Sequence, residues 1–134
     1  VMSAMWSSGA VSMIFGTILP NPDPEDLVQS ANVISAASIG MSQVLSNVPF
    51  VTIYNFVMTD SGVTGAHVDQ WMMLAAASTI AGNLTILGAA SNIIVIEAAE
   101  ARGIPVFSYF EFFKVGSIVT AVNLAVYYVF IVFL

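Results

Sequence analysis

The sequence contains no cysteine and very few charged residues, and both absences narrow what the chain can be. Without cysteine, disulfide frameworks, thiolate metal sites and cysteine nucleophiles are excluded. Only two residues are basic and the formal net charge is −6, so we expect no nucleic-acid partner, because phosphates are met by basic side chains. Charged residues make up 7% of the chain, whereas soluble proteins carry about 25%. So few charges do not cover a water-soluble surface.

Hydrophobic residues take the place of the missing charges. They make up 58% of the sequence, and the mean hydropathy is +0.93. We therefore expect an all-α membrane protein whose solvent is the lipid bilayer, in the cell (inner) membrane. The chain begins at Val1 inside one apolar run and ends at Leu134 inside another, so we interpret it as part of a longer protein.

Charged residues separate the apolar stretches, and the lengths of these stretches predict different structures. A crossing helix needs roughly 20 apolar residues, so we expect transmembrane helices over residues 1–19 and 107–134. The stretch 27–59 is too long for one straight crossing and too short for two. We predict a re-entrant helical hairpin there, with its tip near 46–49, where a polar pair and a proline interrupt the apolar run.

The stretch 70–101 carries a second interruption, at 83–92, where glycine and asparagine residues disfavour a continuous helix. We predict a discontinuous transmembrane helix that is unwound there. Unwound backbone persists in hydrocarbon only where protein or a water-filled cavity satisfies it. Ahead of the hairpin, Asp23 and Pro24 are typical of a helix start, with Asp23 as the N-cap and the proline at the first helical position.

The two basic residues predict the orientation. Arg102 and Lys114 both lie between the broken helix and the last helix, so the positive-inside rule makes that link cytoplasmic. Counting crossings backwards places the segments 60–69 and 20–26 outside. The hairpin then enters the membrane from its outer face.

The hairpin tip and the helix break are the two places where polar groups gather at membrane depth. Transporters commonly direct half-helix N-termini at an anion and unwound carbonyls at Na⁺. An asparagine amide suits both partners, because it donates through its nitrogen and accepts, or ligates a cation, through its oxygen. Ser, Thr, Asn and Gly also serve simply as packing residues of membrane helices, and for each residue alone that alternative stays open.

At these motifs the sequence resembles a known family. Ser46-Asn47-Val48-Pro49 and, further on, Ala81–Asn92 resemble the ion transporter superfamily, which includes the citrate and dicarboxylate/sodium symporters, the arsenite permeases and related antiporters. The segments Ile96–Gly103 and Phe110–Gly116 are similar to that family as well, so the resemblance covers nearly the whole chain. It implies the C-terminal part of a second inverted repeat, with an N-terminal repeat of the same protein and a second copy in a homodimer as partners.

The resemblance also implies roles for single residues. The residues expected to bind substrate are Ser46, Asn47, Ser91 and Asn92. The residues expected to bind the coupling ion are Asn47, Asn83, Thr85 and Gly88. That ion would be Na⁺, and no other cofactor or metal is expected. Val48 departs from the family pattern, because dicarboxylate symporters typically have threonine there. The lost hydroxyl moves the resemblance toward the arsenite-permease and citrate-like branches.

We therefore expect a secondary active transporter and not an enzyme. It would move a small anion, such as citrate, a dicarboxylate or an arsenite-like solute, by alternating access coupled to Na⁺ or H⁺. The alternatives are a passive ion channel built on a re-entrant loop and a Na⁺/H⁺ antiporter of the same superfamily. An intramembrane enzyme is disfavoured, because the single histidine, His67, lies in a short polar loop.

Overall fold

The computed structural model describes residues 19–133, and within that range every regular element is helical. The all-α part of the predicted fold class is thereby confirmed. The predicted helix over 1–19 lies, except for Leu19, outside the described residues. The elements are α3 (Leu27–Leu45), α4 (Asn47–Asp60), α5 (Val68–Ala81), the short 3₁₀ helix η1 (Ile86–Gly88), α6 (Ala90–Glu100) and α7 (Tyr109–Phe133).

Helix α3 begins at Leu27, three residues later than the predicted first helical position, Pro24. The Asp26 carboxylate accepts a hydrogen bond of 2.9 Å from the Gln29 N–H, so Asp26 is the N-cap and Asp23 is not. Asp23 instead accepts from the Glu25 N–H at 3.0 Å, and its carbonyl accepts from the Asp26 N–H. These bonds close a tight turn around Pro24 that precedes the helix. The assignment of Asp23 as the N-cap was therefore wrong.

Within the predicted hairpin range, two helices meet at a single residue. Ser46 separates α3 from α4. Its backbone has φ 62° and ψ 161°, a conformation that residues other than glycine rarely adopt. Asn47 is already the first residue of α4. Pro49 lies in the first turn of that helix, where its missing N–H removes no helical hydrogen bond. The placement of this helix pair as a re-entrant hairpin in a membrane stays a prediction.

The broken stretch is helical on both sides of a non-helical segment. Helix α5 ends at Ala81 and α6 begins at Ala90, so the non-helical residues run from 82 to 89, interrupted only by η1. This segment is shorter than the predicted 83–92. The helix resumes early because Ala89 is extended, with φ −145° and ψ 135°, which sets the chain direction for α6 directly behind it.

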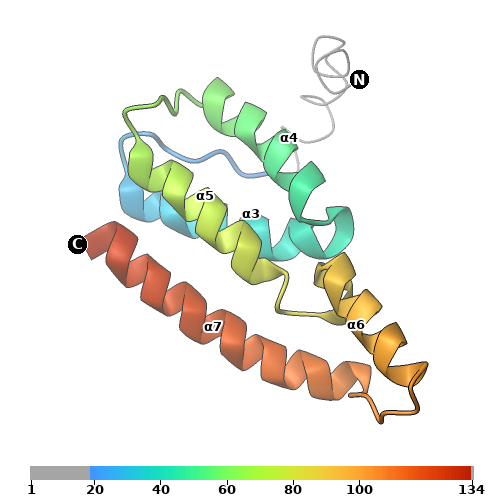
Figure 1. Ribbon diagram of the computed structural model, residues 1–134. Helices are drawn as coiled ribbons and strands as arrows, with labels where there is room; N and C mark the ends of the chain where they lie inside the picture. The colour runs from blue at the N-terminus through green and yellow to red at the C-terminus, as the bar shows by residue number, and fades with distance from the viewer. Residues whose placement is uncertain (1–18, 134) are drawn as a thin grey trace.

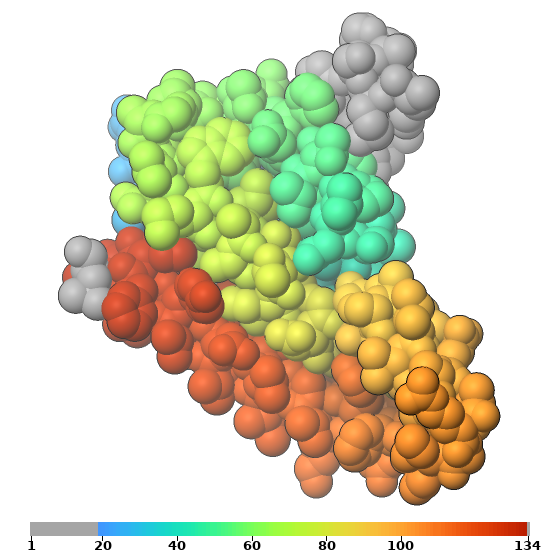
Figure 2. All heavy atoms as spheres, in the orientation of Figure 1, coloured from blue at the N-terminus to red at the C-terminus, as the bar shows by residue number. Residues whose placement is uncertain are grey.

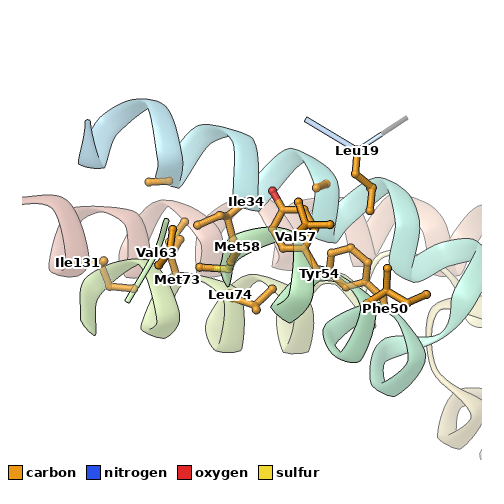
Figure 3. Packing of buried hydrophobic residues seen from close by; sticks show 13 residues of the cluster. Leu19, Ile34, Phe50, Tyr54, Val57, Met58, Val63, Met73, Leu74 and Ile131 are labelled. Carbon is orange, nitrogen blue, oxygen red and sulfur yellow. The ribbon is translucent and has the colours of Figure 1, made fainter. Parts of the chain in front are cut away.

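The helices α3, α4 and α5 pack together, and α7 runs back along α5 on the other side (Figure 1). Buried apolar side chains form most of their core, and several buried serines lie beside them. The Phe50 and Tyr54 rings stack with centroids 5.3 Å apart, and the Tyr54 hydroxyl donates to the Pro20 carbonyl at 3.1 Å. Figure 3 shows these rings among the buried side chains, which include Ile34, Val57, Met58, Met73 and Leu74.

The C-terminal third is much more exposed than this core. Helix α6 buries none of its residues, and with the segment behind it forms a lobe at one end of the molecule (Figure 2). Helix α7 has 25 residues and a mean hydropathy of 2.0 over its most apolar window, and it is the one described helix whose length and composition suffice to cross a membrane. A single such helix is weak evidence by itself. Only 17% of that window is buried, unlike the core helix of a soluble protein.

Candidate functional site

Side chains from the flanking helices satisfy the unwound backbone between α5 and α6. The Asn92 amide nitrogen donates to the carbonyl of Gly82 at 3.0 Å and to that of Thr85 at 3.1 Å. Asn92 thus folds back from the first turn of α6 over the turn that precedes it. Both of its N–H groups are engaged with backbone, and its amide oxygen remains for another partner.

Thr85 organises the second half of the break. Its hydroxyl oxygen accepts from the Gly88 N–H at 3.0 Å and so caps η1. The same hydroxyl donates to the side-chain oxygen of Gln43 at 2.7 Å. Thr85 and Gly88 are both buried. The structure therefore brings three of the predicted site residues, Thr85, Gly88 and Asn92, into one hydrogen-bonded segment.

Gln43 connects this segment to the hairpin, and sequence reasoning missed it. Its amide nitrogen donates across to the carbonyl of Ala81 at 2.8 Å and, within α3, to the carbonyl of Ile39 at 3.2 Å. Helix α3 is thereby bonded to the last residue of α5 and, through Thr85, to the break. No local signal distinguished it, because α3 also carries Gln29 and Asn32.

Oxygen atoms converge on the space beside Gly88. A Cβ atom built on this glycine would lie 2.8 Å from the Gln43 side-chain oxygen, 3.1 Å from the Gly82 carbonyl oxygen and 3.2 Å from the Ala81 carbonyl oxygen. Hard oxygen donors of this kind, carbonyl and amide, are the ligands that Na⁺ finds at broken helices. None of the side chains in this cluster titrates, so its polarity comes from dipoles alone.

Among the described residues, no hydrogen bond joins the Asn47 side chain to this cluster. Its amide oxygen accepts from the Ser42 hydroxyl at 3.3 Å, which ties the start of α4 to the end of α3. It also borders a cavity of about 300 Å³ between α4 and α5. The polar residues sharing this cavity are Thr52, Ser78 and Thr79.

Asn83 faces α7 and not the cluster around Gly88. Its side chain is exposed and borders a mostly apolar cavity of about 250 Å³ against the start of α7, together with Phe112 and Val115. On the same side, a Cβ built on Gly116 would lie 2.3 Å from the Asn83 carbonyl oxygen and 2.8 Å from that of Leu84. Only a glycine lets α7 come this close to the break.

The two predicted serines are more peripheral. Ser46 and Ser91 are exposed, and no hydrogen bond among the described residues joins either side chain to the Gln43–Thr85 cluster. The other five predicted residues divide into three places: the cluster around Gly88, the cavity beside Asn47, and the α7 side at Asn83.

The chain is similar to proteins named as transporters, although no family model and no solved structure matches it. An uncharacterized transporter of Mycobacterium tuberculosis is 33% identical over 104 residues, which is 75% of this chain and 24% of that protein. The 46 kDa membrane protein of Mycobacterium leprae is 32% identical over 89 residues, 63% of this chain and 20% of its own length. The silicon efflux transporter LSI3 of Oryza sativa subsp. japonica is 37% identical over 76 residues, 54% of this chain and 16% of the transporter.

These relatives are much longer than the matched region. The chain spans about a quarter of the length of the curated relatives it matches first. Their names concern transport and the membrane, which agrees with the coarse prediction made from composition.

Proposed function

We propose that this chain is part of a secondary active transporter that moves a small anion across the cell membrane by alternating access, coupled to Na⁺ or H⁺. The observation that carries the proposal is the bonded contact between the α3–α4 pair and the break between α5 and α6. Two interrupted helices joined through buried neutral polar groups are what a midplane binding site requires, since such groups cost less than charges at that depth. The transporter names of the relatives support the same class.

The proposed ion position is the oxygen-lined space beside Gly88. There the carbonyl oxygens of Ala81 and Gly82 face a common space, and the Gln43 side chain holds the Ala81 carbonyl in place. The end of α5 adds the negative end of its helix dipole, which favours a cation. The Asn92 amide oxygen, whose nitrogen is engaged with backbone, extends this polar surface toward the start of α6.

The proposed substrate is a compact inorganic oxyanion or oxyacid of the arsenite type, in preference to a dicarboxylate. One support is Val48, which replaces a hydroxyl expected at the tip of a dicarboxylate symporter. The other is the printed name of the rice relative, which concerns silicon efflux. Asn47 would contact this substrate from the start of α4, where the helix N-terminus favours negative charge.

The test is a transport assay on the full-length protein in proteoliposomes. Arsenite, silicic acid and citrate are offered with a Na⁺ gradient, with a proton gradient, or with neither. Coupled transport appears only with one of the gradients, whereas flux down the solute gradient alone would establish the passive channel. Na⁺/H⁺ exchange without movement of any anion would establish the antiporter alternative.

Two variants of α4 localise the site in the same assay. Asn47→Ala should lower the apparent substrate affinity by roughly 5- to 150-fold, the equivalent of about 1–3 kcal/mol for an unsatisfied buried partner. Asn55→Ala is the matched control, since it removes an exposed amide from the same helix. Equal affinities in the two variants would place the substrate away from Asn47.

A further inference from the structure

The Gln43 carboxamide bonds at once to both sides of the turn in the break, which we call its two arms: the end of α5 at Ala81 and the segment that begins at Thr85. Its nitrogen holds the Ala81 carbonyl, which ends α5, and its oxygen holds the Thr85 hydroxyl, which lies beyond the turn. A single rigid plane therefore spans the residues between the two arms. Because Gln43 belongs to α3, the spacing of the arms depends on a helix outside the broken one.

Gly88, Thr85 and Gln43 form a chain of hydrogen bonds in which each group donates to the next. The Gly88 N–H donates to the Thr85 hydroxyl oxygen at 3.0 Å, and that hydroxyl donates its own proton to Gln43 at 2.7 Å. The rotation of the Thr85 side chain is thus set by an acceptor on α3. Since Thr85 and Gly88 are buried, water does not replace a lost partner at low cost.

Gly88 is glycine because of the space beside it, not because of its backbone conformation. Its φ is not in the left-handed region, so conformational freedom does not require it. A Cβ at this position would instead lie 2.8 Å from the Gln43 side-chain oxygen, which is too close for any real contact. The missing side chain makes room for the carboxamide that spans the break.

We propose that Gln43 is the positioning residue of the site, and that it holds the break in its binding geometry only while α3 is seated against α5. This inference rests on the proposed transport function and deepens it. Gln43 acts through Thr85 and the Ala81 carbonyl, so movement of the α3–α4 pair alters the arrangement of the ion and substrate ligands. The plain structural alternative is that Gln43 contributes one more buried hydrogen bond, with no bearing on affinity.

The first experiment is a double-mutant cycle in the full-length protein. Gln43→Leu and Thr85→Val each remove one side of the bond, and each should weaken the apparent affinity for the coupling ion about tenfold, which corresponds to about 1.4 kcal/mol. The double variant should weaken it by less than the product of the two single effects, because both remove the Gln43–Thr85 bond. Affinities that multiply across the two changes would overturn the proposal.

A conservative variant separates positioning from packing. In Gln43→Glu, the carboxylate still accepts from Thr85 but does not donate to the Ala81 carbonyl, whereas the protonated acid does both. Ion affinity relative to the wild type should therefore recover as the pH falls, and Gln43→Leu should show no such recovery. If the ion affinity of each variant relative to the wild type does not change with pH, the positioning role is contradicted.

A rescue experiment tests the space beside Gly88. Gly88→Ala should reduce ion affinity as Gln43→Leu does, but should cost less in a Gln43→Ala background, where the nearest oxygen is gone and only the Gly82 and Ala81 carbonyls, at 3.1 and 3.2 Å, still crowd the Cβ. Gly40→Ala is the control, since nothing lies within 4 Å of a Cβ built there and Gly40 is on the same helix as Gln43. If Gly88→Ala is equally harmful in both backgrounds, Gly88 does not make room for Gln43.

Thermal unfolding of the same purified variants keeps this inference distinct from the proposed function. If none of the offered solutes is transported, the proposed function fails, and the unfolding midpoints still show whether Gln43, Thr85 and Gly88 are coupled. If transport is coupled and normal in all the variants, the positioning role fails alone. Where Gln43→Leu does not yield folded protein, Gln43→Asn, which is too short to span both arms, enters the same cycle.

Discussion

Gly116 offers the sharpest test of the packing between α7 and the break. This buried glycine faces two carbonyls of the turn, and a Cβ added to it would lie 2.3 Å from the Asn83 oxygen and 2.8 Å from the Leu84 oxygen. Ordinary Cα–H···O contacts are about 3.3–3.6 Å long, so Gly116→Ala forces a retreat of about 1 Å. The opposing atoms are backbone, so no side-chain rotation relieves the clash.

The expected size follows from two opposing effects. Overpacking costs about 1–3 kcal/mol, and rigid backbone partners favour the upper end of that range. Alanine regains about 1 kcal/mol of helix propensity relative to glycine. Gly40→Ala in α3 isolates the propensity gain, because its Cβ meets nothing within 4 Å. The difference in the free energy of unfolding between the two variants should therefore be about 1–3 kcal/mol.

Unfolding in detergent, followed by fluorescence or by aggregation on heating, measures this difference on the full-length protein. Transport should fall as well, because a displaced turn moves the Asn92 and Thr85 partners that it carries. If Gly116→Ala unfolds like Gly40→Ala and transports like the wild type, α7 does not support the break, and the close approach has no energetic role.

Three further predictions concern topology, ion coupling and the Asn92 contacts. Cysteines introduced at Asp26 and Asp60 should be labelled from the same, outer side and one at Arg102 from the cytoplasm; opposite labelling of the first two would remove the re-entrant hairpin. Bound Na⁺ should raise the free energy of unfolding by about 2.7 kcal/mol at 100 times Kd, and K⁺ should not; a response to pH alone would favour proton coupling. Asn92→Ala removes the side-chain donor of the Gly82 carbonyl and one of the two donors of the Thr85 carbonyl, and should cost about 1–3 kcal/mol in unfolding experiments. Ser38→Ala removes a buried hydroxyl that has no hydrogen-bond partner among the described residues, and should be nearly neutral. Equal effects of these two changes would mean that Asn92 is a packing residue.

Local chemistry was enough to predict where the helices are interrupted. Glycine and asparagine lower helix propensity wherever they occur, so Gly82, Asn83 and Gly88 indicated a break that the structure has at 82–89. The helix start was less exact, because Asp23 and Asp26 are both competent caps and only one had its carboxylate near a free N–H of the first turn. Low charge and high hydropathy likewise indicated a membrane protein, before any contact was known.

The sequence alone therefore determined the helical class and the positions of the polar interruptions, because both depend on residues close together in the chain. Only the tertiary structure decided which polar groups meet. Gln43 lies 38 residues from Ala81 and 42 from Thr85, and nothing in a local pattern distinguishes it from a glutamine facing another helix. The same holds for Gly116, whose close contact with the break exists only because α7 packs back along α5. Contacts of this range arise from helix packing, which spacing along one helix does not encode.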